Sequence, residues 1–147
     1  MYKTVEGSCG ERRSFAITVG LAEGYGPTVK THTIDEVVEL VLGHLKIRAA
    51  DGRLYLTGTV SAGEVVYAWP EEPGKAGGGH EPNVIYSGEV SPLYNKDLGD
   101  NEVAEILNDL ASELGSALGQ TRVYVAFGHE TWILQNEETE TPTGETV

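Results

Sequence analysis

The chain has 147 residues, enough for one domain that buries about 68–70% of the surface of its unfolded state. Its formal net charge of −13 repels phosphate backbones and excludes ordinary DNA or RNA binding. The single cysteine, Cys9, cannot form an internal disulfide, and no apolar run approaches the roughly 20 residues that cross a bilayer.

Composition divides the chain into three parts. Residues 1–13 predict a flexible leader without the apolar core of a signal peptide, so we expect a cytoplasmic protein with no membrane contact. Residues 14–136 predict a single domain. Residues 137–147 contain four of the 23 acidic residues and predict a disordered acidic tail.

The first half of the domain predicts a strand, a helix and a hairpin. Residues 14–21 alternate apolar and small or polar side chains, the period of a half-buried strand. Thr33 and Glu36 have the spacing of a capping box, so a helix begins there. Its apolar residues form one stripe, which three more widen, so we expect this helix to be packed on more than one side. The stripe is Ile34, Val37, Val38, Val41 and Leu45, and the widening residues are Leu40, Leu42 and Ile47.

Glycine and proline then divide the chain into short segments. Asp51-Gly52 predicts a turn, and residues 53–60 and 64–69 predict two strands joined through 61–63. The prolines and glycines that follow predict a mobile surface loop over 71–83. Residues 84–90 predict another strand.

The second helix has the firmest pattern in the sequence. Asp100 is the expected N-cap and Gly119 the expected helix stop. Residues 122–127 and 131–135 predict a second hairpin. The apolar residues of this helix recur at helical spacing and should be buried: Val103, Ile106, Leu107, Leu110, Leu114 and Leu118.

This order of elements reads as βαββ followed by βαββ, an internal duplication in which Arg53–Leu56 corresponds to Arg122–Val125. The expected class is α+β, with an antiparallel or mixed sheet of about six strands and two helices packed on one face. The other sheet face would be exposed, so we expect a homo-oligomer in which a second copy covers it.

Known catalytic motifs are missing from the sequence. Its four histidines have no metal-binding spacing, and Cys9 has no partner thiol. The segment PGKAGGGH lacks the order of a phosphate-binding loop, and no serine lies in a nucleophile elbow. We therefore expect no catalytic residues, no metal and no cofactor.

Candidate ligand-binding residues lie at the ends of the predicted strands and in the connectors. Arginine makes paired, charge-assisted hydrogen bonds to phosphate, and aromatic rings stack on bases. The alternative is that these side chains only rim the sheet. The candidates are Arg122, Arg53 and Arg48 for charge, with Tyr94, Asn95, Trp69 and Tyr25 beside them.

The size, the acidity, the two helices on a sheet and the segment GQTRVYV after the second helix together resemble the anti-Thoeris sponges, small phage proteins that counter bacterial defence. The resemblance implies a non-enzymatic oligomer that sequesters a cyclic ADP-ribose signal. We therefore expect a binder of a small phosphorylated nucleotide in the host cytoplasm.

Two alternatives from other classes stay open. One is an acidic decoy that occupies a nucleic-acid-binding host enzyme, such as a defence protein, through the acids of the second helix. The other is a small metal enzyme, since paired halves of this layout resemble glyoxalase and bleomycin-resistance proteins.

Overall fold

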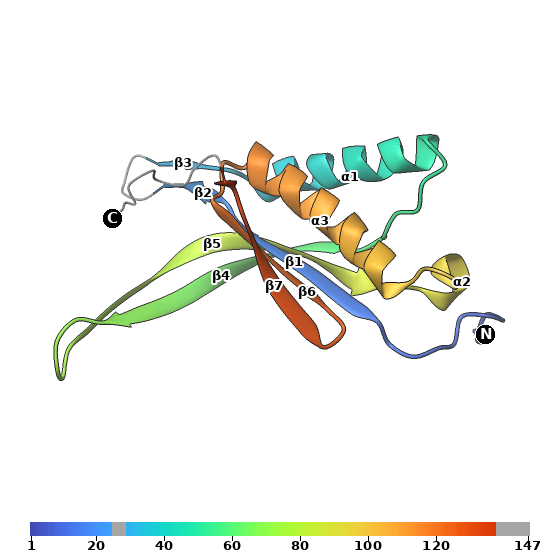
Figure 1. The fold of residues 1–147 in the computed structure, drawn as a ribbon, viewed down its shortest axis with the longest axis horizontal. Coiled ribbons are helices and arrows are strands. Elements are labelled where there is room, and N and C mark those ends of the chain that lie inside the picture. Colours follow the sequence, from blue (N-terminus) through green and yellow to red (C-terminus); the bar gives the residue numbers. More distant parts are fainter. Residues whose placement is uncertain (25–28, 138–147) are drawn as a thin grey trace.

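The computed structural model describes residues 1–24 and 29–137, and its centre is a five-stranded antiparallel sheet with the strand order β4-β5-β1-β6-β7 (Figure 1). These strands are β1 (Ser14–Gly20), β4 (Thr59–Pro70), β5 (Ala76–Glu89), β6 (Arg122–Phe127) and β7 (Glu130–Gln135). The remaining elements are the small paired strands β2 (Ala22–Glu23) and β3 (Lys30–Thr31), and the helices α1 (Ile34–Ala50), α2 (Pro92–Asn95) and α3 (Asp100–Ala117).

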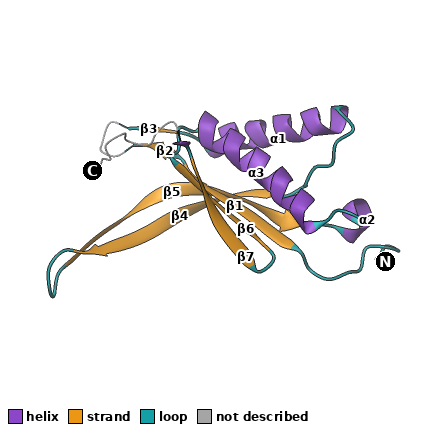
Figure 2. Cartoon of the chain, viewed as in Figure 1, coloured by secondary structure: helices purple, strands orange, loops and turns teal. Residues whose placement is uncertain are grey.

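Both long helices lie on the same face of the sheet (Figure 2). Successive side chains of a strand point to opposite faces, and the sheet buries one set of them beneath the helices. This set comprises Phe15, Ile17 and Val19 of β1, Val84 and Tyr86 of β5, and Val123, Val125 and Phe127 of β6. The opposite set forms what we call the open face of the sheet.

The expected start of α1 is confirmed. Glu36 N donates to Thr33 Oγ1 at 3.2 Å, and Thr33 N donates to Glu36 Oε1 at 3.2 Å, which completes the capping box. Only one side of the helix is covered, because Val38, Leu42 and Ile47 are exposed. The expected burial on a second side is therefore wrong.

The six apolar residues predicted to be buried on and just after α3 are all buried. Each contributes roughly 1.5–3 kcal/mol before side-chain entropy is subtracted. The N-cap is Gly99, and Asp100 is the first helical residue. Gly119 follows the helix with φ +64°, the left-handed conformation that a glycine adopts at little cost.

The segment after α1 differs from the expectation. Residues 53–58 form no strand, and residues 59–70 form the single strand β4, which pairs with β5 rather than folding on itself. Residues 76–83, expected in a mobile loop, belong to β5. The distal part of the β4–β5 hairpin, residues 66–80, extends away from the helices, and we call it the arm (Figure 1).

The α+β class, the antiparallel sheet and the two helices on one face are confirmed. The correspondence of Arg53 with Arg122 is not found, because Arg53 lies outside the strands and Arg122 begins β6. None of the described helices is long and apolar enough to cross a membrane.

Candidate functional site

The open face carries the hollow that we consider the candidate site. It has a volume of about 660 Å³, within the range of small-molecule sites. The lining comes mainly from strands β1, β2, β4, β5 and β6 and from the segment after α3. The residues that matter for the argument are Thr18, Gly20, Tyr67, Glu81, Asn83, Gln120, Arg122 and Tyr124.

Asn83, which lines this open-face hollow, is the middle residue of a row of three paired residues. Asn83 of β5 lies opposite Gly20 of β1 on one side and opposite Gly63 of β4 on the other. Paired residues of antiparallel strands share a sheet face, so the amide of Asn83 lies between two positions that have no side chain.

Asn83 is buried, with 7% of its surface exposed, and its Oδ1 accepts no hydrogen bond from the described residues. Nearly all buried side-chain polar atoms have a partner. A buried acceptor without one costs about 1–3 kcal/mol. The lining of the hollow therefore presents a hydrogen-bond acceptor that the described chain leaves unused.

Two opposite charges lie in the wall. Glu81 is half-buried and Arg122 is exposed. Arg122 Nε donates to Gln135 Oε1 at 3.1 Å, and neither Glu81 nor Arg122 forms an ion pair with any residue of 1–24 or 29–137. The hollow can thus bind a ligand that carries both a cationic group and a carboxylate, because it offers one side chain of each charge.

Aromatic side chains complete the wall. Tyr67 of β4 and Tyr124 of β6 both line the hollow. Further out on the arm, Trp69 stacks on Tyr67 with ring centroids 6.0 Å apart. Such rings can pack against a base or another flat group.

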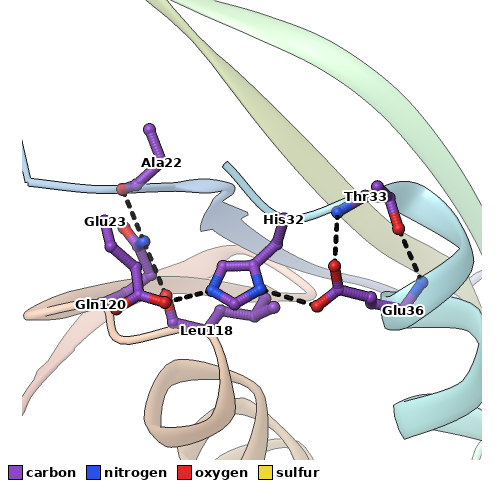
Figure 3. Close-up of polar contacts among 7 residues, drawn as sticks. All are labelled: Ala22, Glu23, His32, Thr33, Glu36, Leu118 and Gln120. Atoms are coloured by element: carbon purple, nitrogen blue, oxygen red, sulfur yellow. Dashed lines mark hydrogen bonds and ion pairs between the residues drawn. The ribbon is translucent and has the colours of Figure 1, made fainter. Parts of the chain in front are cut away.

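The edge of the hollow near α3 is fixed by Gln120 (Figure 3). Its Nε2 donates to the carbonyl oxygens of Ala22 at 2.8 Å and Leu118 at 3.0 Å. The side chain therefore joins β2 to the end of α3.

His32 provides a second tie at this edge (Figure 3). Its ring is buried, with Nδ1 2.7 Å from Glu36 Oε2 and Nε2 in contact with Glu23. The hydrogen bond to Glu36 raises the pKa of His32 against the opposing effect of burial, and it lowers the pKa of Glu36. The protonated ring, which donates from both nitrogens, holds β2 to the start of α1.

Two of the predicted arginines lie at a different place, an acidic hollow of about 570 Å³ lined by the end of α1, residues 53–54 and α3. Arg48 is buried and donates to the Leu54 carbonyl at 2.6 Å and to Asp109 Oδ2 at 3.1 Å. Arg53 lies 3.6 Å from the same Asp109 oxygen. Both guanidinium groups are thus paired with the chain's own carboxylate.

The other predicted residues do not gather around one point. Tyr94 and Asn95 are on α2, and Tyr94 is exposed. Trp69 is on the arm, next to the open-face hollow, and its ring lies across Gly77. Tyr25 lies outside the described residues. Of the six predicted residues that the structure describes, only Arg122 lines the open-face hollow.

Sequence reasoning missed Glu81 and Asn83, because the prolines and glycines of 71–83 indicated a loop. The alternation of buried Val84 and Tyr86 with Ile85 and Ser87 is a strand pattern that can be extended backwards to both residues. Among the described residues, no group of three or more histidines, cysteines or carboxylates could hold a metal ion.

Comparisons with known proteins give a likeness of fold. No protein-family model matches the sequence, and neither does any curated protein. Two solved structures are similar over almost their whole length, a phage SAM lyase in complex with S-methyl-5'-thioadenosine and a phage SAM lyase in the apo state. The TM-scores are 0.62 and 0.65, at 22% identity in both, and the matches cover 95% of this chain and 99% and 100% of those chains.

These structures correct the expected function. Both of these structures are of a lyase, which contradicts the expectation of a non-enzymatic sequestering protein and the sponge resemblance behind it. The expected phage context agrees with the neighbours. Their ligand, S-methyl-5'-thioadenosine, is a small nucleoside, as expected in outline, although it carries no phosphate. The chain has the fold of a phage SAM lyase.

Proposed function

We propose that this chain is an enzyme that binds S-adenosylmethionine in the open-face hollow and cleaves it to S-methyl-5'-thioadenosine. The observation that carries the proposal is the shared fold, which extends over 95% of this chain and 99% of a phage SAM lyase that binds this nucleoside. The position of the site within the fold rests on the lining of the hollow.

The charges of the hollow suit this substrate. S-adenosylmethionine carries a sulfonium, an ammonium and a carboxylate, so its net charge at neutral pH is +1. A chain with a net charge of −13 attracts it. Glu81 would face the sulfonium or the ammonium, and the guanidinium of Arg122 would pair with the carboxylate.

The reaction breaks the bond between the sulfonium sulfur and the terminal methylene of the amino-acid side chain. The bonding electron pair stays on sulfur, and neutral S-methyl-5'-thioadenosine departs. A lyase adds no water, so the carbon that leaves sulfur must form its new bond within the four-carbon fragment. This happens through attack of the fragment's carboxylate on that carbon or through loss of a neighbouring proton.

The positive charge on sulfur decreases in the transition state, and this determines whether Glu81 contributes to substrate binding or to the rate. A carboxylate beside the sulfonium stabilises the bound substrate more than the transition state, so it contributes to binding rather than to rate. We therefore expect Glu81→Gln to raise KM about tenfold or more and to leave kcat within a few fold.

Mass-spectrometric detection of S-methyl-5'-thioadenosine formed from S-adenosylmethionine tests the proposal directly. The matched control is Glu105→Gln, because Glu105 lines the acidic hollow instead, and its kinetics should equal those of the wild type. No product above the level without protein would contradict the proposed activity. An effect of Glu105→Gln with none of Glu81→Gln would place the site in the acidic hollow.

The open face also supports the expected homo-oligomer as a proposal. A single-sheet face with this much exposed apolar surface is suited to burial against a second copy. Sedimentation equilibrium should give a mass above that of one chain, and a monomer at micromolar concentration would contradict it. The exposed apolar residues of this face are Val65, Tyr67, Trp69, Tyr124 and Ile133.

A further inference from the structure

The unused acceptor of Asn83 is the feature that the proposed function leaves unexplained. Its Oδ1 is buried in the lining of the open-face hollow and has no hydrogen-bond partner among the described residues. Buried polar atoms are almost always paired. An acceptor that stays unpaired inside a binding hollow is suited to a donor that arrives with the ligand.

The neighbouring glycines fix where this amide lies. A Cβ at Gly63 would be 2.6 Å from Asn83 Oδ1, so the amide leans over Gly63 and needs that space. On the other side, a Cβ at Gly20 would be 2.6 Å from Gln120 Oε1. The two glycines therefore leave room for the side chains of Asn83 and Gln120 beside each other, and the pairing of β5 on both sides fixes the backbone of Asn83 in the lining of the hollow.

An asparagine amide presents an acceptor beside a donor. Adenine has the complementary pair on one edge, the N6 amino donor beside the N7 acceptor, and paired recognition of this edge by Asn is a recurrent contact. The aromatic rings of Tyr67 and Tyr124 line the same hollow and can stack on the base. Amide and aromatic groups together match the base of a nucleoside better than its ribose.

We infer that Asn83 is a specificity-determining residue that reads the adenine edge of the ligand, with Oδ1 accepting from the N6 amino group. The inference deepens the proposed function and rests on it. It predicts that the protein distinguishes an adenine nucleoside from its deaminated counterpart, in which a 6-oxo group replaces the amino donor.

The test is calorimetric titration with S-methyl-5'-thioadenosine and with its 6-oxo counterpart. The wild type should bind the adenine compound at least about tenfold more tightly. Asn83→Ala and Asn83→Leu should lose this preference and bind both compounds with similar affinity. Asn95→Ala is the matched control, because Asn95 is on α2 and outside the hollow, and it should keep the wild-type preference.

Thermal unfolding without ligand separates recognition from a structural role. Leucine has nearly the shape of asparagine and removes the unpaired acceptor, so Asn83→Leu should unfold at the wild-type temperature or above it. A clear drop for this variant together with retained base preference would overturn the inference and make Asn83 structural.

The remaining outcomes are also decisive. If the wild type binds both compounds equally, or if Asn83→Ala keeps the preference, the inference is wrong while the proposed function stands. If the wild type binds neither compound and forms no product, the proposed function fails, and the inference fails with it. A changed oligomer mass in Asn83→Leu with unchanged affinity would assign the acceptor to a subunit contact instead.

Discussion

Replacing Tyr86 with phenylalanine tests the contribution of one buried hydroxyl. The Tyr86 side chain is 2% exposed, packs against Phe15, and donates from its hydroxyl to the Leu56 carbonyl oxygen at 2.6 Å. This bond ties the irregular segment 53–58 to β5 beneath the helices. Tyr86→Phe keeps the ring and removes the hydroxyl, so the free energy of unfolding should fall by about 1–3 kcal/mol.

The assays are urea unfolding and thermal unfolding, both followed by circular dichroism at neutral pH, with Tyr55→Phe as the control because Tyr55 is 40% exposed. For a chain of this size, each kcal/mol corresponds to about 2–4 °C in Tm. We therefore expect a drop of roughly 2–12 °C for Tyr86→Phe and almost none for the control. Equal values for the two variants would refute the reasoning.

Alkaline pH gives an independent check on the same bond. Burial raises the pKa of Tyr86 from 10.0 to about 12. The folded-state pKa lies above that of the unfolded chain, so the hydroxyl's contribution is complete below pH 10 and is lost as the pH rises toward 12. The difference in stability between wild type and Tyr86→Phe should shrink over this interval, and a constant difference would contradict the burial of a neutral hydroxyl.

Two further predictions concern stability. Glu36 raises the pKa of His32, so the stability that His32 adds is complete below its ordinary pKa of about 6.5 and is lost as the pH rises through the raised value. His32→Gln should flatten the dependence of the urea midpoint on pH above about pH 6.5, and an unchanged pH profile would contradict this. A Cβ at Gly115 would lie 2.7 Å from Val123 Cγ2, so Gly115→Ala should destabilise by about 1–3 kcal/mol. Gly43→Ala, whose Cβ meets nothing within 4 Å, should stabilise by about 0.5–1 kcal/mol; the same sign in both variants would refute the close approach of α3 to β6.

Local patterns were sufficient for the elements whose two sides differ in polarity. The helical spacing of the apolar residues of α3 and the Thr33–Glu36 capping box each predicted a feature that the structure contains. Such signals lie within a few turns of one segment, so they can be seen without knowing the partner. The α+β class followed from the order of these elements.

The arm could not be predicted from local patterns in this way. Its side chains are mostly exposed on both faces, so β4 and the start of β5 carry little alternation. Residues 64–69 were predicted as a strand, but the glycines and prolines of 71–83 indicated a loop. The strand exists because the two segments pair with each other along residues 59–70 and 76–87, a pairing that neither segment shows alone.

The candidate site depended even more on the tertiary structure. Arg122 could be named from its position at a strand start, but its neighbours in the hollow come from five strands and the turn after α3. Arg48 and Arg53 carry the same charge in the sequence, yet Asp109 of α3 pairs with both. Which charges stay available to a ligand is decided by distances between segments that lie far apart along the chain.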